Sequence, residues 1–371
     1  MKIITLKNNL KDGLSSVERA VSDNNNLPIL KYVLIKVGDG KIQLTTTNLE
    51  LAVTSLVSGK IIEDGGIAIP LSTFSSIVSG ADNERIDLEV KNNNLHIKTD
   101  NYEAKIQGLS KEEFPIIPKL ENEDRYIELP FSVFKNGIDC VSSAAQISEI
   151  RPELSGVLFD LNNTTLKLAA TDSFRLSEKT ITGNQIKTNI SESFKAIIPL
   201  KTIQEISRIF DVNNPIKIFF DTHQIVVRND KNELVSRLID GNYPDYEQII
   251  PKNHQIEVVI PKDGFTNALK LVSNFSGKVN DIRLRIKNGG KALELYSSNQ
   301  NLGENNYLIP IKSNNSEEMD VAFNWRYLFD GVKVTDSKEF IFLLNGEQKP
   351  AVLKLVDDPS YFYLVMPIRN T

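Results

Sequence analysis

The stretch Leu168-Ala169-Ala170-Thr171-Asp172 decides the fold, because similar stretches occur on both sides of it at nearly constant distance. They are Leu44-Thr45-Thr46-Thr47-Asn48, 124 residues earlier, and Leu295-Tyr296-Ser297-Ser298-Asn299, 127 residues later. An apolar-rich run and a turn of glycine, asparagine or aspartate precede each stretch, which is typical of a β-hairpin. A period of this length exceeds that of solenoid repeats and predicts three tandem copies of one domain.

A second landmark keeps the same phase along the chain. Ile69-Pro70-Leu71, Ile198-Pro199-Leu200 and Phe323-Asn324-Trp325 each introduce a short stretch with helical spacing of apolar residues. Each copy also opens with an amphipathic helix. The apolar positions of these opening helices are Leu10, Leu14, Val17 and Val21, then Phe134, Ile138, Val141 and Ala145, then Phe265, Leu269 and Val272.

We therefore expect an α+β protein of three tandem copies, at residues 1–125, 126–252 and 253–371. Each copy is predicted to be a two-helix, antiparallel-sheet domain with the element order β-α-β-β-β-α-β-β-β. Aromatic-proline pairs, Phe114-Pro115 and Tyr243-Pro244, mark the extended segments at the two joins. Proline-bounded linkers of this kind fix the relative angle of the domains that they join.

The composition is that of an ordinary globular protein. The 371 residues are 40% hydrophobic and 25% charged, with a formal net charge of −5. Collagen-like and wholly disordered chains are excluded, and any nucleic-acid binding has to come from a local basic face. The single cysteine, Cys140, excludes an intrachain disulfide framework and indicates a reducing compartment. With no signal-peptide pattern and no apolar run of about 18 residues, we expect a cytoplasmic protein without membrane contact.

Residues for catalysis or metal binding do not form a recognisable pattern. The three histidines, His96, His223 and His254, lack the spacing of zinc ligands and are expected at the surface of strands or loops. Gly40-Lys41 and Gly290-Lys291 lack the flanking residues of a phosphate-binding loop and fit hairpin turns. No Gly-x-Ser-x-Gly sequence is present. We expect no catalytic residue, no metal and no cofactor.

Basic residues recur on the polar faces of the predicted helices. Lys11 and Arg19 lie opposite the first apolar stripe, and Lys201 and Arg208 belong to the second helix of the middle copy. Any single lysine is more simply explained as part of a solvated helix face, so the recurrence is the stronger argument. Strand-rich copies also leave sheet edges that aggregate unless they are paired, and closure into a ring removes them.

Four spaced motifs together resemble one known family. They are residues 151–159 (RPELSGVLF), 170–176 (ATDSFRL), 242–246 (NYPDY) and 365–369 (VMPIR). The family is the bacterial DNA polymerase III beta subunit, the replicative sliding clamp, and the resemblance covers the whole chain. It implies the DNA-clamp architecture, in which a head-to-tail homodimer forms a six-domain ring around double-stranded DNA of any sequence. Such a ring catalyses nothing. It tethers the polymerase and raises its effective concentration at the primer end.

The same resemblance implies that partners dock through short linear motifs in an apolar groove beside the C-terminal strand. The implied partners are the DNA polymerase III alpha subunit, the clamp loader, and other polymerases and repair proteins. The groove residues carried over by motif are Leu154, Thr171, Ser173, Phe174, Arg175, Leu176, Pro244, Ile249, Leu364, Met366, Pro367, Ile368 and Arg369. Core packing is the simpler explanation for Leu176 or Ile249 taken alone. Ser173-Phe174 stands where family members often carry Gly-His or similar, so we expect a bulkier wall.

Two further surfaces follow from the resemblance. The DNA-contact candidates are Lys11, Arg19, Asn24, Lys201 and Arg208, with Lys201 the strongest. For the subunit interface, Leu271 and Val272 of the third domain are expected to face the strand near Ile106 of the first. The implied location is the bacterial cytoplasm, at replication forks on the nucleoid.

Two other classes of function remain open from the residues alone. A β-rich adhesion or scaffold module keeps the three copies but needs neither basic helix faces nor a terminal apolar strand. A hydrolase that uses carboxylates such as Glu153 and Asp172 predicts a raised carboxyl pKa and turnover of a substrate. Deletion of residues 366–371 separates these hypotheses, because only the clamp loses the binding of partner peptides.

Overall fold

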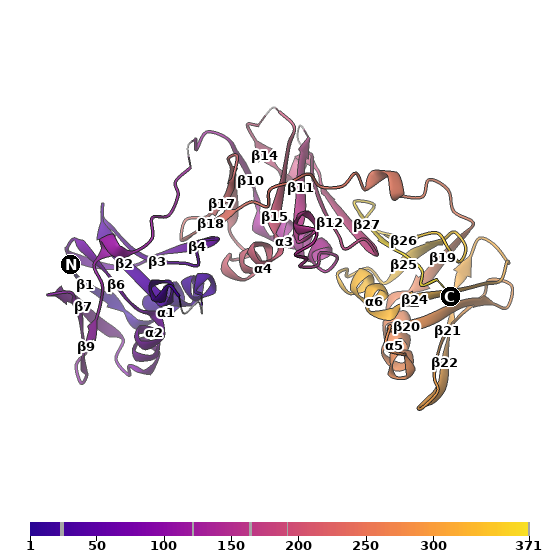
Figure 1. Cartoon of the computed structure of the whole chain (residues 1–371), viewed down its shortest axis with the longest axis horizontal. Coiled ribbons are helices and arrows are strands. Elements are labelled where there is room, and N and C mark those ends of the chain that lie inside the picture. The colour runs from indigo at the N-terminus through magenta and orange to yellow at the C-terminus, as the bar shows by residue number, and fades with distance from the viewer. Residues whose placement is uncertain (23–25, 121, 163–164, 191, 370–371) are drawn as a thin grey trace. The chain divides into compact units, whose positions relative to one another are not determined.

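The computed structural model describes residues 1–22, 26–120, 122–162, 165–190 and 192–369 (Figure 1). The chain forms two compact units. The first unit consists of Met1–Phe131, Lys187–Ile190 and Gln204–Leu238. The second unit consists of Ser132–Ile186, Ser191–Ile203 and Ile239–Thr371. The first unit therefore holds the first copy and about half of the second copy, and the second unit holds the remainder.

One order of elements occurs three times in the described residues: a strand, a helix, five strands, a second helix and three strands. In the first copy these are β1 (Lys2–Leu6), α1 (Lys7–Val17), β2 (Tyr32–Gly38), β3 (Lys41–Thr47), β4 (Leu51–Val57), β5 (Gly59–Glu63), β6 (Gly65–Pro70), α2 (Leu71–Gly80), β7 (Arg85–Lys91), β8 (Asn94–Lys98) and β9 (Glu103–Gln107). In the second copy they are β10 (Tyr126–Pro130), α3 (Phe131–Ser142), β11 (Gly156–Asn162), β12 (Thr165–Thr171), β13 (Arg175–Ile181), β14 (Lys187–Thr188), β15 (Phe194–Pro199), α4 (Leu200–Ile209), β16 (Pro215–Phe220), β17 (Gln224–Arg228) and β18 (Asn232–Arg237). In the third copy they are β19 (Ile256–Pro261), α5 (Lys262–Val272), β20 (Asp281–Lys287), β21 (Ala292–Asn299), β22 (Gly303–Pro310), β23 (Lys312–Ser313), β24 (Met319–Asn324), α6 (Trp325–Lys333), β25 (Glu339–Leu344), β26 (Ala351–Leu355) and β27 (Tyr361–Val365).

The number of strands between the two helices corrects the prediction. The sequence predicts three strands there in each copy, and the structure has five. One additional strand pairs with the opening strand of its copy, and in β14 and β23 it has only two residues. The other, β6, β15 or β24, runs directly into a helix, so its residues read as a helix start in the sequence pattern.

The opening helices pack on the sheets through the predicted apolar stripes. In α1, Leu10, Leu14 and Val17 are buried, and Gly13 lets the helix approach the sheet, since a Cβ there would lie 2.8 Å from Val57. The helix ends at Val17, so the predicted fourth position, Val21, lies outside it. In the first copy α1 contacts α2, and in the third copy α5 contacts α6 (Figure 1).

Each unit contains one nine-stranded antiparallel sheet that crosses from one copy to the next. In the first unit its order is β14-β10-β16-β17-β18-β4-β3-β2-β6, and in the second unit it is β15-β11-β12-β13-β27-β26-β25-β19-β23. We call the β4–β18 pairing with linker 108–125 the first junction, and the β13–β27 pairing with linker 238–255 the second junction. Val53 lies opposite Leu234 at the first junction, and Ser177 lies opposite Tyr363 at the second.

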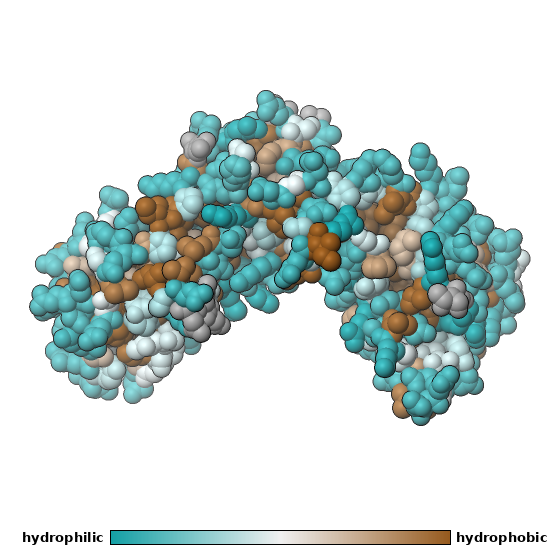
Figure 2. Space-filling view, in the orientation of Figure 1, coloured by the Kyte–Doolittle hydropathy of each residue, from teal (hydrophilic) through white to brown (hydrophobic). Residues whose placement is uncertain are grey.

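Two shorter sheets complete the fold. The first unit has a five-stranded sheet, β5-β1-β7-β8-β9, and the second unit has a four-stranded sheet, β22-β21-β20-β24. Residues on the strands alternate between buried and accessible positions, as in β20, because successive side chains point to opposite faces. Figure 2 shows polar residues over most of the visible surface, with apolar patches between them.

The hairpin turns confirm one prediction directly. Gly40 has a φ of 72° in the turn between β2 and β3, and Gly290 has a φ of 82° in the turn between β20 and β21. Glycine adopts this left-handed conformation without steric cost. Both glycine-lysine pairs are therefore parts of hairpins and not of phosphate-binding loops.

Candidate functional site

The predicted groove residues come together at the second junction, from three parts of the second unit. Arg175 and Leu176 of β13 lie opposite Val365 and Leu364 of β27. Just beyond this pairing, the backbone N–H of Met366 donates to the carbonyl of Phe174 at 2.8 Å. The C-terminal segment is therefore fixed beside the turn that precedes β13.

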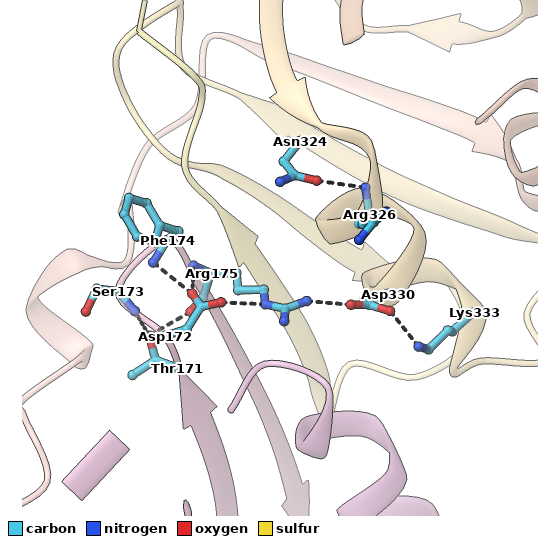
Figure 3. A network of polar contacts seen from close by, with 9 residues as sticks. All are labelled: Thr171, Asp172, Ser173, Phe174, Arg175, Asn324, Arg326, Asp330 and Lys333. Atoms are coloured by element: carbon cyan, nitrogen blue, oxygen red, sulfur yellow. Dashed lines mark hydrogen bonds and ion pairs between the residues drawn. The ribbon is translucent and has the colours of Figure 1, made fainter. Parts of the chain in front are cut away.

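That turn, residues 171–175, is built by its own side chains (Figure 3). The Thr171 hydroxyl donates to the Arg175 carbonyl at 2.6 Å, and Asp172 Oδ1 accepts the N–H groups of Phe174 and Arg175 at 2.9 and 3.0 Å. Ser173 has a φ of 76°, a conformation that is uncommon for residues other than glycine. The result is that the Phe174 side chain projects outward and is 60% exposed.

An apolar cluster lies beneath the turn. Its buried members are Leu158, Ala169, Leu176, Ile197, Tyr246, Leu343, Val352 and Leu364. Met366 and Tyr243 pack against this cluster and remain partly accessible, and Ile249 is 51% exposed. Leu176 is completely buried, which favours core packing over a direct contact with a partner. Ile249, by contrast, is a surface residue.

The remaining predicted groove residues differ in exposure. Leu154 and Thr171 are buried, Pro244 is half-buried, and Pro367 is buried. Ile368 donates its backbone N–H to the Ala322 carbonyl at 2.8 Å. With exposed Arg369, it lines a cavity of about 180 Å³ that also contacts Asp320 and Glu347.

Arg175 is engaged inside the protein. Its Nε lies 2.8 Å from Asp172 and its Nη1 lies 2.5 Å from Asp330 of α6, while its guanidinium stacks over the Tyr327 ring at 4.3 Å (Figure 3). Burial opposes its charge, but Tyr363, Asp172 and Asp330 outweigh burial and raise the pKa of Arg175 above its ordinary value. Only 11% of the side chain is exposed, so the main role of Arg175 is to connect the turn to α6. It is not a free cation at the surface.

Two more polar contacts that the sequence motifs did not mark hold the second junction. The buried Tyr246 hydroxyl donates to Glu178 at 2.6 Å, and Lys167 lies 2.8 Å from Glu247. Burial raises the pKa of Tyr246, so the hydroxyl keeps its proton and remains a donor. Glu178, a buried acid in a strand, was the available signal, because such a group needs a partner.

The DNA-contact candidates are exposed on or beside helices. Lys11 lies on α1, Arg19 lies in the 3-10 turn after it, and Lys201 lies on α4. In the described part of the chain, these three have no ion-pair partner, whereas Arg208 pairs with Glu205 at 3.1 Å. Asn24 lies outside the described residues.

One of the three predicted interface residues has to be withdrawn. Val272 is completely buried in its own unit, because it belongs to the apolar stripe of α5. Leu271, its neighbour, is exposed, whereas Ile106, on β9 at the edge of the five-stranded sheet, is itself buried, with a relative exposure of 7%. Leu271 therefore remains a candidate through its side chain, and Ile106 only through the backbone of its edge strand.

The structure offers little for a hydrolase or a metal site. Glu153 pairs with Arg151 at 3.1 Å, and Asp172 is occupied by the turn and by Arg175. Burial raises the pKa of the Cys140 thiol to about 11, which keeps it protonated and unreactive at neutral pH. No cluster of metal-ligating side chains occurs in the residues that the structure describes. Among those same residues, no helix is long and apolar enough to cross a membrane.

Three family models match consecutive parts of the chain. They describe the N-terminal, central and C-terminal domains of the DNA polymerase III beta subunit, and they match residues 1–118, 128–245 and 247–369. The curated beta sliding clamp of Bacillus subtilis is 28% identical, with all of both chains covered. That of Staphylococcus epidermidis is also 28% identical, over 96% of each chain.

Solved structures agree with this assignment. The DNA polymerase sliding clamp of Bacillus subtilis aligns with a TM-score of 0.93 at 26% identity, covering all of both chains. The clamp of Pseudomonas aeruginosa bound to griselimycin aligns with a TM-score of 0.94 at 25% identity, again over both whole chains. The three-domain fold of mixed helices and antiparallel sheets is thus that of the clamps. The chain belongs to the DNA polymerase III beta subunit family, the sliding clamps, which are non-catalytic processivity factors of DNA replication.

Proposed function

We propose that this clamp works as a head-to-tail homodimer that encircles double-stranded DNA without regard to sequence. The observation that carries the proposal is the complementarity of the two shorter sheets. Each nine-stranded sheet combines four strands of one copy with five of the next, as in β6-β2-β3-β4 followed by β18-β17-β16-β10-β14. The four-stranded β24-β20-β21-β22 and the five-stranded β9-β8-β7-β1-β5 repeat the strand order of these two parts, so we infer that they pair between subunits as a third such sheet.

Each of these sheets has two edge strands, and those that correspond to the paired strands of the other two junctions are β22 and β9. An unpaired strand edge presents backbone N–H and C=O groups that favour pairing with another chain. Two copies of the chain, each contributing β22 to one interface and β9 to the other, satisfy both edges and close a ring. The domain boundaries that we propose, at residues 125 and 252, fall in the linkers of the other two junctions.

The correspondence between strands also gives the register of this interface. On the face under the linkers, apolar residues pair across both junctions: Ala52 with Val235, and Leu176 with Leu364. The strand pairings give the corresponding residues: Glu304 on β22 lies opposite Ser298 of the repeated stretch, as Ala52 lies opposite Thr47 and Leu176 opposite Thr171. On β9 of the second subunit the residue is Lys105, which lies opposite His96 as Val235 lies opposite Val226 and Leu364 opposite Val352. No linker would cover this third junction, so a charged pair suits its solvated face.

Charge reversal tests this register. Lys105→Glu and Glu304→Lys are each expected to weaken the dimer by about tenfold, because like charges then face each other across the interface. The double variant is expected to regain most of that affinity. Sedimentation equilibrium measures the dissociation constant, with Lys60→Glu on β5, at the opposite edge of the same sheet, as the matched control. If the double variant does not regain affinity, this register is ruled out, whereas the proposal of a dimer is not affected.

The proposed path of DNA follows the exposed basic residues of the helices. Lys11, Arg19, Lys201 and Arg208 suit contacts with phosphates, which carry no sequence information and permit sliding. The test is retention on nicked circular DNA after loading by a clamp loader from a related bacterium. A ring stays on circles in high salt but leaves once the circle is cut, because salt screens contacts without opening a closed loop. Equal loss from both forms after confirmed loading would overturn the proposal.

Partner proteins are proposed to bind at the second junction. Exposed Phe174 and Ile249 and the partly exposed Met366 offer apolar contacts for a short peptide, over a core that fixes their positions. The expected partners are the DNA polymerase III alpha subunit, the clamp loader, and other polymerases and repair proteins. Deletion of residues 366–371 is expected to abolish peptide binding and leave the dimer intact. We also infer that the protein acts in the bacterial cytoplasm, at replication forks.

A further inference from the structure

A second cavity of substantial size lies at the first junction. Its volume is about 640 Å³, and its floor includes Thr45 of β3, Val226 of β17 and Val235 of β18. Residues 111–120 of the linker form the opposite wall. A volume in this range accommodates a few side chains of a ligand and not a folded domain.

This cavity corresponds in the fold to the candidate partner-binding surface at the second junction. The two nine-stranded sheets have the same strand order, so β3, β4, β18 and β17 occupy the places of β12, β13, β27 and β26. The linkers correspond through Phe114-Pro115 and Tyr243-Pro244. At the second junction the place of Ile117 is taken by the buried Tyr246, which bonds to Glu178.

The linker wall of the cavity presents apolar side chains to solvent. Ile117 and Leu120 pack against the buried cluster of Ala52, Phe219, Val226 and Val235. Ile116, which also lines the cavity, is 94% exposed. An aliphatic side chain of a ligand in the cavity would cover Ile116 and remove apolar surface from water.

The charges around the cavity leave an excess of cations. Glu123 and Glu233 both pair with Arg228, at 3.1 and 2.6 Å, and Glu112 lies 3.7 Å from Lys111. The two remaining charged residues of the lining, Lys36 and Lys119, have no ion-pair partner among the described residues. The acids of the lining are thus all engaged, and two ammonium groups are available to a negatively charged ligand.

We propose that this cavity is a second docking site, which takes a short extended peptide of a partner protein with alternating acidic and apolar residues. In an extended peptide, successive side chains point to opposite sides. The apolar ones then contact Ile116 and the partly exposed Ile117, and the carboxylates approach Lys36 and Lys119. The site lies at the first junction and is distinct from the partner-binding surface proposed at the second.

The test uses the full chain carrying Phe174→Ala, which weakens the second junction as a competing site. The probes are two fluorescein-labelled hexapeptides, Glu-Leu-Glu-Leu-Glu-Leu and Lys-Leu-Lys-Leu-Lys-Leu, and fluorescence anisotropy measures their dissociation constants. The acidic peptide is expected to bind at least about tenfold more tightly than the basic one. Lys36→Glu is expected to weaken the acidic peptide by about tenfold, and Ile116→Ser by about fivefold.

Matched controls separate the site from general surface effects. Lys41→Glu changes an exposed lysine of β3 outside the lining, and Ile150→Ser changes a comparably exposed isoleucine of the second unit. Both are expected to leave the affinity unchanged. Equal binding of the two peptides, or equal effects of Lys36→Glu and Lys41→Glu, would overturn the proposal. If the acidic peptide binds the wild type and Phe174→Ala abolishes that binding, the peptide occupies the second junction: this inference fails while the proposed function stands. Should Lys36→Glu lower the melting temperature, Lys119→Glu takes its place.

Discussion

The first and second junctions of this clamp each contain a turn of the same backbone conformation, but different side-chain contacts hold the two turns in place. In both, a threonine hydroxyl donates to the carbonyl four residues later, at 3.0 Å from Thr47 and 2.6 Å from Thr171. In both, the third residue of the turn has a positive φ, 75° at Leu49 and 76° at Ser173. Two unlike sequences therefore impose the same backbone, because the side chains that bond to it are equivalent.

The difference begins at the last residue of the turn. Arg175 at the second junction forms ion pairs with Asp172 and Asp330, whereas the corresponding Leu51 at the first junction is simply buried. Four residues on, Lys179 pairs with Asp358 where the first junction has Ser55. A buried ion pair is weak evidence for added stability, but its charges need their partners in place. We infer that charge fixes the arrangement of the second junction and apolar burial that of the first.

Loss of Arg175 is expected to have the largest effect on this comparison. Arg175→Ala leaves Asp172 and Asp330 without their shared cation, which costs about 3 kcal/mol of unfolding free energy. Arg151→Ala, which removes an exposed partner of Glu153, is the matched control and should cost less than about 0.5 kcal/mol. Urea denaturation measures both. Equal losses would mean that the buried network contributes no more than a surface pair.

The close approach of α6 to the second junction gives the next largest effect. A Cβ on Gly331 would lie 2.7 Å from the Tyr363 ring, so Gly331→Ala is expected to cost about 2 kcal/mol through overpacking. Gly264→Ala in α5 is the control, because its Cβ would meet nothing nearer than 3.7 Å. That substitution should stabilise the helix by about 0.5 kcal/mol. Thermal unfolding measures the stability of both variants. A stabilised Gly331→Ala variant would contradict the expected overpacking and show that α6 can move away from Tyr363.

Tyr246 tests how firmly its linker is held. Tyr246→Phe removes the donor to buried Glu178 and is expected to cost about 1 kcal/mol, measured by urea denaturation. Tyr102→Phe is the control, since the Tyr102 side chain is exposed and its hydroxyl has no hydrogen-bond partner within the described residues. It should be neutral. If both substitutions behave alike, the bond to Glu178 does not distinguish the second junction.

The smallest expected effect is a dependence on pH. Burial alone would raise the pKa of Asp358, but Lys179 and Ser360 outweigh burial and hold it below its ordinary value. A lowered carboxyl pKa contributes stability above the unfolded value and loses it as the pH falls below about 4. Because Asp358 is partly exposed, Asp358→Asn should cost less than about 1 kcal/mol at pH 6, and the cost should shrink as the pH falls below about 4 and toward the lowered pKa of Asp358. A difference between wild type and variant that does not shrink with falling pH would contradict this assignment.

The sequence predicts most of the fold because most of it rests on local patterns. The three copies, the apolar stripes of the opening helices and the hairpin turns at Gly40 and Gly290 follow from spacing and from residues that tolerate a positive φ. The two-residue strands β14 and β23 do not, because two residues carry no periodicity and exist only through pairing with β10 and β19.

The candidate site is predictable to a similar extent. The motifs include the turn, the linker and the C-terminal strand, and the structure packs residues of all three around one apolar cluster, while their role in binding partners stays a prediction. They do not give the partner of Arg175, since Asp330 lies 155 positions away and is joined only by the packing of α6. The prediction of Val272 at the subunit interface is wrong because Val272 belongs to the buried apolar stripe of α5 and its side chain cannot serve both roles.

The sheet that crosses the second junction has a consequence for synthesis of the chain. Lys179 of β13 bonds to Ser360, which is translated 181 positions later. Until that segment leaves the ribosome, β13 is an open edge beside a finished hairpin, at risk of pairing with another nascent chain. The rate of translation between these positions, and the chaperones available during that time, therefore affect the yield of native protein. Truncating the chain at the boundary before the third domain would leave the same edge exposed permanently.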